Sequence, residues 1–221
     1  MKCLLLVDIQ NGFCSGGNLA VPDGEAVVVV ANRLMAEGGY DLVVASQDWH
    51  PADHGSFASQ HPGRHPFDMG TLHGKPQMLW PDHCVQGTAD ADFHPALDRA
   101  RIDHVQRKGE NRNIDSYSAF RDNGHEALTD LSRYMIDAGV DRLDICGLAT
   151  DYCVRDSVID ALLLVPGVTV RVVIDACRGI DPAGVTAAIA EMSDAGARIV
   201  TSGEVLQGVK DAAISAHRSS R

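Results

Sequence analysis

The sequence predicts an α/β protein with a doubly wound, mainly parallel six-stranded sheet and helices on both faces. Two observations support this fold class. Short apolar runs alternate along the chain with stretches in which apolar residues recur at helical period. The 221 residues are 45% hydrophobic, which is enough to bury one large core. We therefore expect a single domain over residues 1–208 and a frayed tail over 209–221.

The first part of the chain is expected to form a strand, a helix and a second strand. Residues 2–8 contain an apolar run typical of a buried strand. Apolar residues then recur at i, i+3, i+4 and i+7 from Val27 to Leu34, which indicates a helix that ends at Gly38–Gly39. The apolar run at 41–46 predicts the second strand.

Residues 47–101 lack a regular pattern and are rich in Pro, Gly, His and Asp. Irregular segments of this length are uncommon in compact domains and are usually functional or disordered. The Trp, Phe and His content argues against disorder, so we expect a long functional loop.

The second part of the chain continues the alternation. Strands are expected at 103–106, 143–147, 168–174 and 197–200. Helices are expected from Leu128 to Gly139, from near Asp151 onward, and after Asp181. Asp181 followed by Pro182 is typical of an N-cap with proline at the first helical position, and this helix is expected to reach Gly196.

Charge and composition exclude several classes of protein. The formal net charge of −11 opposes binding to polyanions, and the 19 Lys and Arg residues are scattered, so no nucleic-acid partner is expected. The apolar run at residues 3–7 is too short for a secretion signal or a membrane span. A cytoplasmic protein with no membrane partner is expected, and homo-oligomerisation is left open.

Four residues of catalytic type lie at or just past the ends of predicted strands. Cys153 begins a predicted helix, where free backbone N–H groups and the helix dipole favour a thiolate. Asp8, Asp48 and Lys108 lie at or just past the carboxyl ends of the strands at 2–8, 41–46 and 103–106, and in a doubly wound sheet these strand ends share one edge. A nearby carboxylate raises a thiol pKa, whereas a lysine about 4 Å away offsets this by on the order of three pKa units at most.

A second group of residues has the chemistry of a metal site. Asp48 and His50 are two residues apart in an extended segment, so both side chains can face one ion. His83 lies farther along the same loop, and His54 is either a further ligand or a structural partner of Asp53. Zinc, iron and manganese all accept such nitrogen and oxygen ligands. The loop at about 47–101 is therefore expected to carry a metal site.

Roles outside catalysis and metal binding are expected for most other histidines and cysteines. Solvated side chains are expected for His61, His65, His73, His94 and His104. Cys3 and Cys146 are expected to be buried inert thiols, and Cys84 a packed thiol rather than a ligand for a soft metal.

Five linked motifs carry a resemblance that spans residues 2 to about 205. They are Val7–Phe13, the segment Gln47–Phe57, Trp80–Thr88, Lys108-Gly109 together with Ser116–Phe120, and Gly147–Val154. In this order they resemble the nicotinamidases, which belong to the isochorismatase-like cysteine hydrolases.

The resemblance implies a role for each matching position. It implies that Cys153 is the nucleophile, Asp8 the acid-base partner and Lys108 the third member of a triad. It also implies a cis peptide at Leu148–Ala149 and an oxyanion hole from the backbone N–H groups of Ala149 and Cys153. The implied metal ligands are Asp48, His50 and His83, with His54 an additional ligand in only some relatives and zinc the favoured ion. The implied pocket walls are Phe13, Trp80, Tyr117 and Tyr152.

The activity implied by this resemblance is conversion of nicotinamide to nicotinate and ammonia through a thioester, in NAD salvage, with pyrazinamide as an expected second substrate. Alternatives stay open at this point. They are hydrolysis of another small amide of carbamoyl or ureidoacrylate type, a metallohydrolase in which Cys153 is incidental, and a non-catalytic metal- or ligand-binding domain. A vinyl-ether hydrolase is disfavoured because it would not use the cysteine.

Overall fold

A computed structural model describes the backbone of residues 1–219 and the side chains of residues 1–215. Six strands form one sheet in the order β5-β2-β1-β6-β7-β8, and each neighbouring pair is parallel. This confirms the predicted fold class. The strands are β1 (Lys2–Val7), β2 (Leu42–Asp48), β5 (His104–Lys108), β6 (Arg142–Leu148), β7 (Thr169–Arg178) and β8 (Arg198–Val200).

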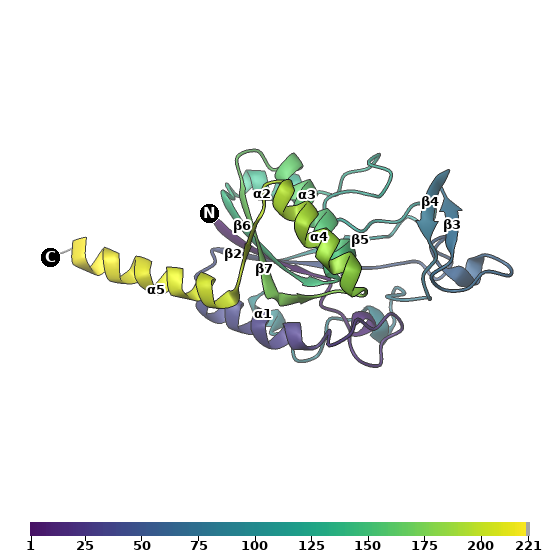
Figure 1. Ribbon diagram of the computed structural model, residues 1–221, viewed down its shortest axis with the longest axis horizontal. Helices are drawn as coiled ribbons and strands as arrows, with labels where there is room; N and C mark the ends of the chain where they lie inside the picture. The colour runs from purple at the N-terminus through teal and green to yellow at the C-terminus, as the bar shows by residue number, and fades with distance from the viewer. Residues whose placement is uncertain (220–221) are drawn as a thin grey trace.

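Helices cover both faces of the sheet. They are α1 (Ala26–Glu37), α2 (Leu131–Asp137), α3 (Arg155–Leu164), α4 (Pro182–Asp194) and α5 (Ser202–Ser219). Figure 1 shows α2, α3 and α4 on one face and α1 on the other, with α5 beside α1 and extending away from the body of the molecule. Within residues 1–219, no helix has the length and apolar character needed to cross a membrane.

The core is centred on β1, which lies between β2 and β6. Because helices cover both of its faces, β1 is a continuous apolar run in which Leu4, Leu5 and Leu6 are fully buried. The register places Asp48 of β2 directly beside Lys108 of β5, and Val7 of β1 beside Gly147 of β6. The carboxyl ends of four neighbouring strands thus meet at one edge.

The local signals for α4 are confirmed in detail. Asp181 is the N-cap, its carboxylate accepts a hydrogen bond from the backbone N–H of Gly184 at 2.7 Å, and Pro182 opens the helix.

The predicted helix from Leu128 begins later in the structure. α2 begins at Leu131, and Leu128 is exposed and paired with Arg121 in an isolated antiparallel bridge. The carboxylate of Asp122 accepts hydrogen bonds from the backbone N–H groups of Glu126 and Ala127, at 3.0 and 2.8 Å. This side-chain-to-backbone turn competes with helix formation and holds the chain extended up to residue 128.

The loop and tail also differ from the prediction. Residues 47–101 contain a two-stranded antiparallel hairpin, β3 (Met69–Leu72) and β4 (Lys75–Met78). The expected frayed tail is helical instead: α5 passes through residue 208 and continues to Ser219, while residues 220–221 lie outside the described part of the chain. α5 is anchored at its start, where Asp175 accepts hydrogen bonds from the backbone N–H and hydroxyl of Ser202. That the chain forms a single domain stays a prediction.

Candidate active site and metal centre

The residues of catalytic type gather at the carboxyl ends of the four neighbouring strands. Asp8 follows β1, Asp48 ends β2, Lys108 ends β5, and Cys153 lies in the turn after β6. All four side chains are buried, with at most 6% of their surface exposed. The parallel topology therefore brings together residues that are up to 145 positions apart in the sequence.

The ammonium of Lys108 is at the centre of this cluster. Nζ lies 3.0 Å from Oδ2 of Asp8, 2.7 Å from Oδ1 of Asp48 and 3.5 Å from Sγ of Cys153. It also donates a hydrogen bond to the carbonyl oxygen of Ser116 at 2.9 Å. One buried cation thus contacts a thiol and two carboxylates.

Asp8 is held in place by β2. The hydroxyl of Ser46 donates a hydrogen bond to Oδ1 of Asp8 at 2.6 Å and accepts one from the Asp8 backbone N–H at 3.2 Å. The Asp8 backbone has a φ of 48°, in the left-handed region that a residue other than glycine rarely occupies. Such a conformation at a strand end is common at functional sites and turns the carboxylate toward Lys108.

Burial and charge set the protonation of the three groups. Burial, followed by the nearby Asp48 carboxylate, raises the pKa of Asp8, although Lys108 opposes the shift. Burial disfavours the cationic form of Lys108, yet the carboxylates of Asp48 and Asp8 outweigh it and hold the Lys108 pKa well above its ordinary value. The cluster therefore contains a permanent cation and a carboxylate that is more basic than usual.

The thiol of Cys153 differs from the sequence-based expectation of a thiolate. Burial raises its pKa well above the ordinary value; Lys108 lowers it, and the carboxylates of Asp8 and Asp48 raise it further. The helix-start argument considered the dipole alone, whereas in the structure desolvation of the sulfur exceeds the stabilisation by Lys108. The resting thiol is protonated, so a base must remove its proton as it reacts.

The turn that carries Cys153 joins β6 to α3. The Leu148–Ala149 peptide is cis, as the resemblance implied. Residues Thr150–Val154 form a wide π-helical turn, in which the carbonyl oxygen of Ala149 accepts hydrogen bonds from the backbone N–H groups of Tyr152 and Val154, both at 3.1 Å.

Three of the predicted metal-site residues converge beside this cluster. Oδ2 of Asp48 lies 3.3 Å from Nε2 of His50 and 3.6 Å from Nε2 of His83. Nδ1 of His50 is 2.9 Å from the carbonyl oxygen of Gly109, and Nδ1 of His83 is 2.8 Å from that of Pro81. Because a carbonyl only accepts, both Nδ1 atoms carry hydrogen, and the neutral form of each ring then has its lone pair on Nε2. One carboxylate oxygen and two imidazole lone pairs fit a divalent transition-metal ion.

His54 lies beside this group but bonds elsewhere. Its ring centroid is 4.3 Å from that of His50, and its Nδ1 lies 2.7 Å from the hydroxyl of Ser56. Burial, and next the charge of His50, lowers the His54 pKa to about 4. The predicted pairing with Asp53 is wrong, because Asp53 forms an ion pair with Arg112 at 2.7 Å.

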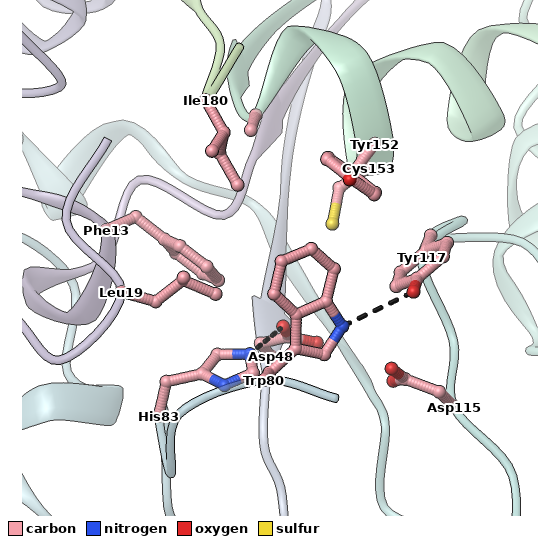
Figure 2. Close-up of a pocket in the computed structure, with 11 residues that line it drawn as sticks. Phe13, Leu19, Asp48, Trp80, His83, Asp115, Tyr117, Tyr152, Cys153 and Ile180 are labelled. Atoms are coloured by element: carbon pink, nitrogen blue, oxygen red, sulfur yellow. Dashed lines mark hydrogen bonds and ion pairs between the residues drawn. The ribbon is translucent and has the colours of Figure 1, made fainter. Parts of the chain in front are cut away.

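A narrow, mainly apolar pocket opens in front of the thiol. Figure 2 shows the Cys153 sulfur pointing into it, with Phe13, Leu19 and Ile180 on one side and Tyr117 and Asp115 on the other. The indole N–H of Trp80 donates to the hydroxyl of Tyr117 at 3.3 Å, and the rings of Trp80 and Tyr152 pack edge to face. Asp48 and His83 line the same pocket, so it joins the thiol to two of the predicted metal ligands.

The chain is similar to known proteins over almost its whole length. Residues 2–204 match the model of the isochorismatase domain. The chain belongs to the isochorismatase family. It is 52% identical over 204 residues to a nicotinamidase of Escherichia coli strain K12, covering 90% of this chain and 94% of that protein.

Solved structures give the same relationship. A nicotinamidase and pyrazinamidase of Acinetobacter baumanii has a TM-score of 0.88 and 41% identity, covering 92% of this chain and 97% of the other. A pyrazinamidase of Pyrococcus horikoshii in complex with zinc has a TM-score of 0.72 and 35% identity, covering 90% and 98%.

The structure thus brings together most residues singled out in this isochorismatase-family sequence. Asp8, Lys108 and Cys153 meet in one cluster, Asp48, His50 and His83 meet in a second that shares Asp48, and the four expected wall residues all line the pocket.

Several residues of the site were missed by the sequence analysis. Leu19, Asp115 and Ile180 line the pocket, Ser46 holds Asp8, and Asp151 accepts hydrogen bonds from the backbone N–H groups of Ile180 and Asp181, both at 3.0 Å. Asp115 directly precedes the motif Ser116–Phe120 and is not part of it. Leu19, Ile180, Ser46 and Asp151 belong to no sequence motif that indicates a functional site. Their roles depend on packing between segments that are distant in sequence.

Other histidines and cysteines with predicted roles are exposed, half-buried or packed. His65 and His73 are exposed as predicted, whereas His61, His94 and His104 are half-buried, and His104 stacks on Tyr134 with a centroid distance of 4.3 Å. Cys3, Cys84 and Cys146 are buried free thiols, and burial raises the pKa of each, as their packed positions predicted.

Proposed function

We propose that this chain is a nicotinamidase, a cysteine amidohydrolase that converts nicotinamide to nicotinate and ammonia in NAD salvage. The observation that carries the proposal is the contact of Lys108 Nζ with both Cys153 Sγ and the Asp8 carboxylate, at 3.5 and 3.0 Å, at the base of an aromatic pocket. The choice of nicotinamide is supported by similarity to nicotinamidases. Pyrazinamide, with the same carboxamide on a similar ring, is a second substrate.

Acylation begins with a protonated thiol, and Asp8 is its base. As Sγ of Cys153 forms a bond to the carboxamide carbon, the thiol proton passes to the Asp8 carboxylate, whose raised pKa makes it a better acceptor. Lys108 remains a cation throughout and stabilises the negative charge that develops on sulfur. Its two carboxylate contacts keep the ammonium fixed before the reaction begins.

Collapse of the tetrahedral adduct releases ammonia. The carboxamide oxygen takes the negative charge, and the backbone N–H groups of Ala149 and Cys153 are assigned to it as the oxyanion hole; loss of one such donor typically costs about 3 kcal/mol. The proton held by Asp8 moves to the departing nitrogen, the C–N bond breaks, and a thioester on Cys153 remains. Asp8 then takes a proton from water, whose oxygen attacks the thioester carbon. As the C–S bond breaks, Asp8 returns this proton to the sulfur, and nicotinate and the free thiol are released.

Asp48, His50 and His83 are the residues that would hold a divalent metal ion, with zinc favoured and iron or manganese as alternatives. When bound, such an ion supplies Lewis-acid polarisation and a coordination position for the pyridine nitrogen of the substrate. Support for zinc comes from the zinc complex of the similar Pyrococcus horikoshii pyrazinamidase. Cytoplasmic localisation stays a prediction.

The test is ammonia release by the zinc-loaded protein from nicotinamide, with pyrazinamide and a carbamoyl compound as comparison substrates. We expect release from nicotinamide and pyrazinamide by the wild-type protein, and none from either amide by the Cys153→Ala variant. Ammonia release at the wild-type rate by that variant would eliminate thiol catalysis. No release by the wild-type protein, despite binding of nicotinamide, would favour a non-catalytic binding domain.

A further inference from the structure

We infer that Gln10 is a positioning residue: its side-chain amide fixes the backbone of Asp48 and so sets the place of the carboxylate that the two clusters share. The inference deepens the proposed function and rests on it. Gln10 lies just past the end of β1 and is completely buried, with 0% of its surface exposed. A buried primary amide has two donor hydrogens and an acceptor oxygen, and all of them need partners.

The partners of Gln10 determine which way its amide points. Oε1 accepts a hydrogen bond from the backbone N–H of Asp48 at 2.8 Å. Nε2 donates to the carbonyl oxygen of Asp48 at 2.9 Å and to that of Ala91 at 2.8 Å. Because a backbone N–H only donates and a carbonyl only accepts, these three contacts allow one orientation of the amide. Both donor hydrogens and the oxygen of Gln10 are thereby paired.

This pairing takes the place of a strand partner for Asp48. β1 and β2 pair in parallel as far as Leu6 and Ala45, and β1 ends at Val7, whereas β2 continues to Asp48. The Gln10 amide offers a donor and an acceptor, as a peptide group would, and bonds both the C=O and the N–H of Asp48. The β1–β2 pairing is therefore continued by a side chain, and the position of Asp48 depends on Gln10.

Gln10 also ties Asp48 to Asp8. The backbone N–H of Gln10 donates to the carbonyl oxygen of Asp8 at 2.8 Å. One residue thus holds the backbones of the two acids whose carboxylates contact the Lys108 ammonium, at 2.7 Å from Asp48 and 3.0 Å from Asp8. The other carboxylate oxygen of Asp48 faces the two histidines of the metal group. A displacement of the Asp48 backbone would therefore disturb both clusters at once.

The direct test is hydrogen exchange of the Asp48 backbone amide, measured by NMR on the metal-free full chain. Gln10→Met fills similar space without hydrogen bonds, and we expect it to speed this exchange by about tenfold or more. Gln47→Met is the matched control, because it removes an amide that donates to the same carbonyl oxygen of Ala91, at 2.9 Å, and it should change the exchange by less than about twofold. An Asp48 exchange rate in Gln10→Met equal to that of the wild-type protein overturns the inference.

The wild-type protein decides the question if Gln10→Met does not fold. We expect the side-chain amide hydrogens of Gln10 to exchange slowly, because both are bonded to buried carbonyl oxygens. Rapid exchange of both hydrogens in the wild-type protein would show that the amide does not hold Asp48.

Zinc affinity and turnover separate positioning from a role in packing alone. In Gln10→Met we expect the zinc affinity and the kcat at saturating zinc and nicotinamide each to fall by about tenfold or more, and in Gln47→Met each to change by less than about twofold. A loss confined to one of these quantities, or an equal loss in both variants, overturns the inference. A wild-type protein that releases no ammonia refutes the proposed function instead, and hydrogen exchange, which needs neither zinc nor turnover, still decides the role of Gln10.

Discussion

The ammonium of Lys108 contacts the thiol and both carboxylates of the site, so its charge governs how readily the sulfur becomes anionic. In the Lys108→Ala variant we expect the Cys153 pKa to rise further and acylation to slow by about 100- to 1000-fold, with a smaller change in substrate binding. The pH profile of iodoacetamide alkylation measures the first effect and single-turnover kinetics the second.

Lys108→Met is the matched control for this prediction, because it fills the same space without charge. Both variants should shift the alkylation profile to higher pH. A profile that matches the wild-type profile in both variants would mean that Lys108 does not tune the thiol.

His54 makes the folded protein sensitive to acid. Burial lowers its pKa from the ordinary value of 6.5 to about 4, so between these two values the unfolded chain binds a proton that the folded protein does not. The free energy of unfolding therefore rises with pH across this window, by about 3 kcal/mol at most. Urea unfolding of the zinc-free protein at several pH values between 4 and 7.5 measures this slope.

His54→Gln removes the titrating group and is the comparison for that experiment. The variant should lose less stability between pH 7 and pH 4 than the wild-type protein does. Parallel stability curves for the two proteins would show that His54 contributes nothing to the acid response.

At the scale of elements, the turn that carries the nucleophile is tied to the start of α4. Asp151 accepts hydrogen bonds from the backbone N–H groups of Ile180 and Asp181, both at 3.0 Å, and Ile180 lines the pocket. In Asp151→Ala we expect a loss of about 1–3 kcal/mol in the free energy of unfolding, because two part-buried backbone N–H donors lose their partner. We also expect a higher KM, because Ile180 is no longer held.

Asp194→Ala, at the exposed end of α4, is the control for this link and should change neither quantity. Thermal unfolding and steady-state kinetics on the two variants provide the comparison. A KM in Asp151→Ala equal to the wild-type value would show that the Asp151 contacts do not position the pocket wall.

Helices were predicted correctly where residues inside or next to the helix determine where it begins or which face is apolar. Asp181 and Pro182 specify the start of α4 by their own chemistry, and the apolar period from Val27 to Leu34 specifies α1. The predicted start of α2 was wrong because the Asp122 carboxylate accepts hydrogen bonds from the turn before the helix. The spacing of apolar residues does not indicate such a turn. α5 was missed because its contact with Asp175 comes from a strand 27 residues earlier.

At the scale of the whole molecule, topology explains why the site could be predicted at all. In a parallel sheet, residues that follow neighbouring strands must meet, so the convergence of Asp8, Asp48, Lys108 and Cys153 follows from the fold class. The protonation of the thiol does not follow from topology. The Cys153 pKa depends on how far burial raises it and how far the Lys108 charge lowers it. The burial of the sulfur depends on the packing of the whole core, which the sequence pattern does not give.

The two clusters share Asp48 but perform separate tasks. Its Oδ1 contacts Lys108 and its Oδ2 faces His50 and His83. Removal of the metal by a chelator should therefore chiefly raise KM for nicotinamide, by about tenfold or more, equivalent to about 1.4 kcal/mol of binding. Steady-state kinetics before chelation, after it and after zinc is restored test this. A loss of kcat with an unchanged KM would contradict the assignment of the ion to ring binding.

The central claim is that the sulfur of Cys153, aided by Lys108 and Asp8, breaks the amide bond. Its most direct test is intact-protein mass spectrometry after rapid acid quench of the zinc-loaded protein with nicotinamide. We expect a nicotinoyl adduct that maps to Cys153, appears together with ammonia and is absent from the Cys153→Ala variant. Turnover of nicotinamide without any acylated protein, at a rate that Cys153→Ala retains, would contradict the claim.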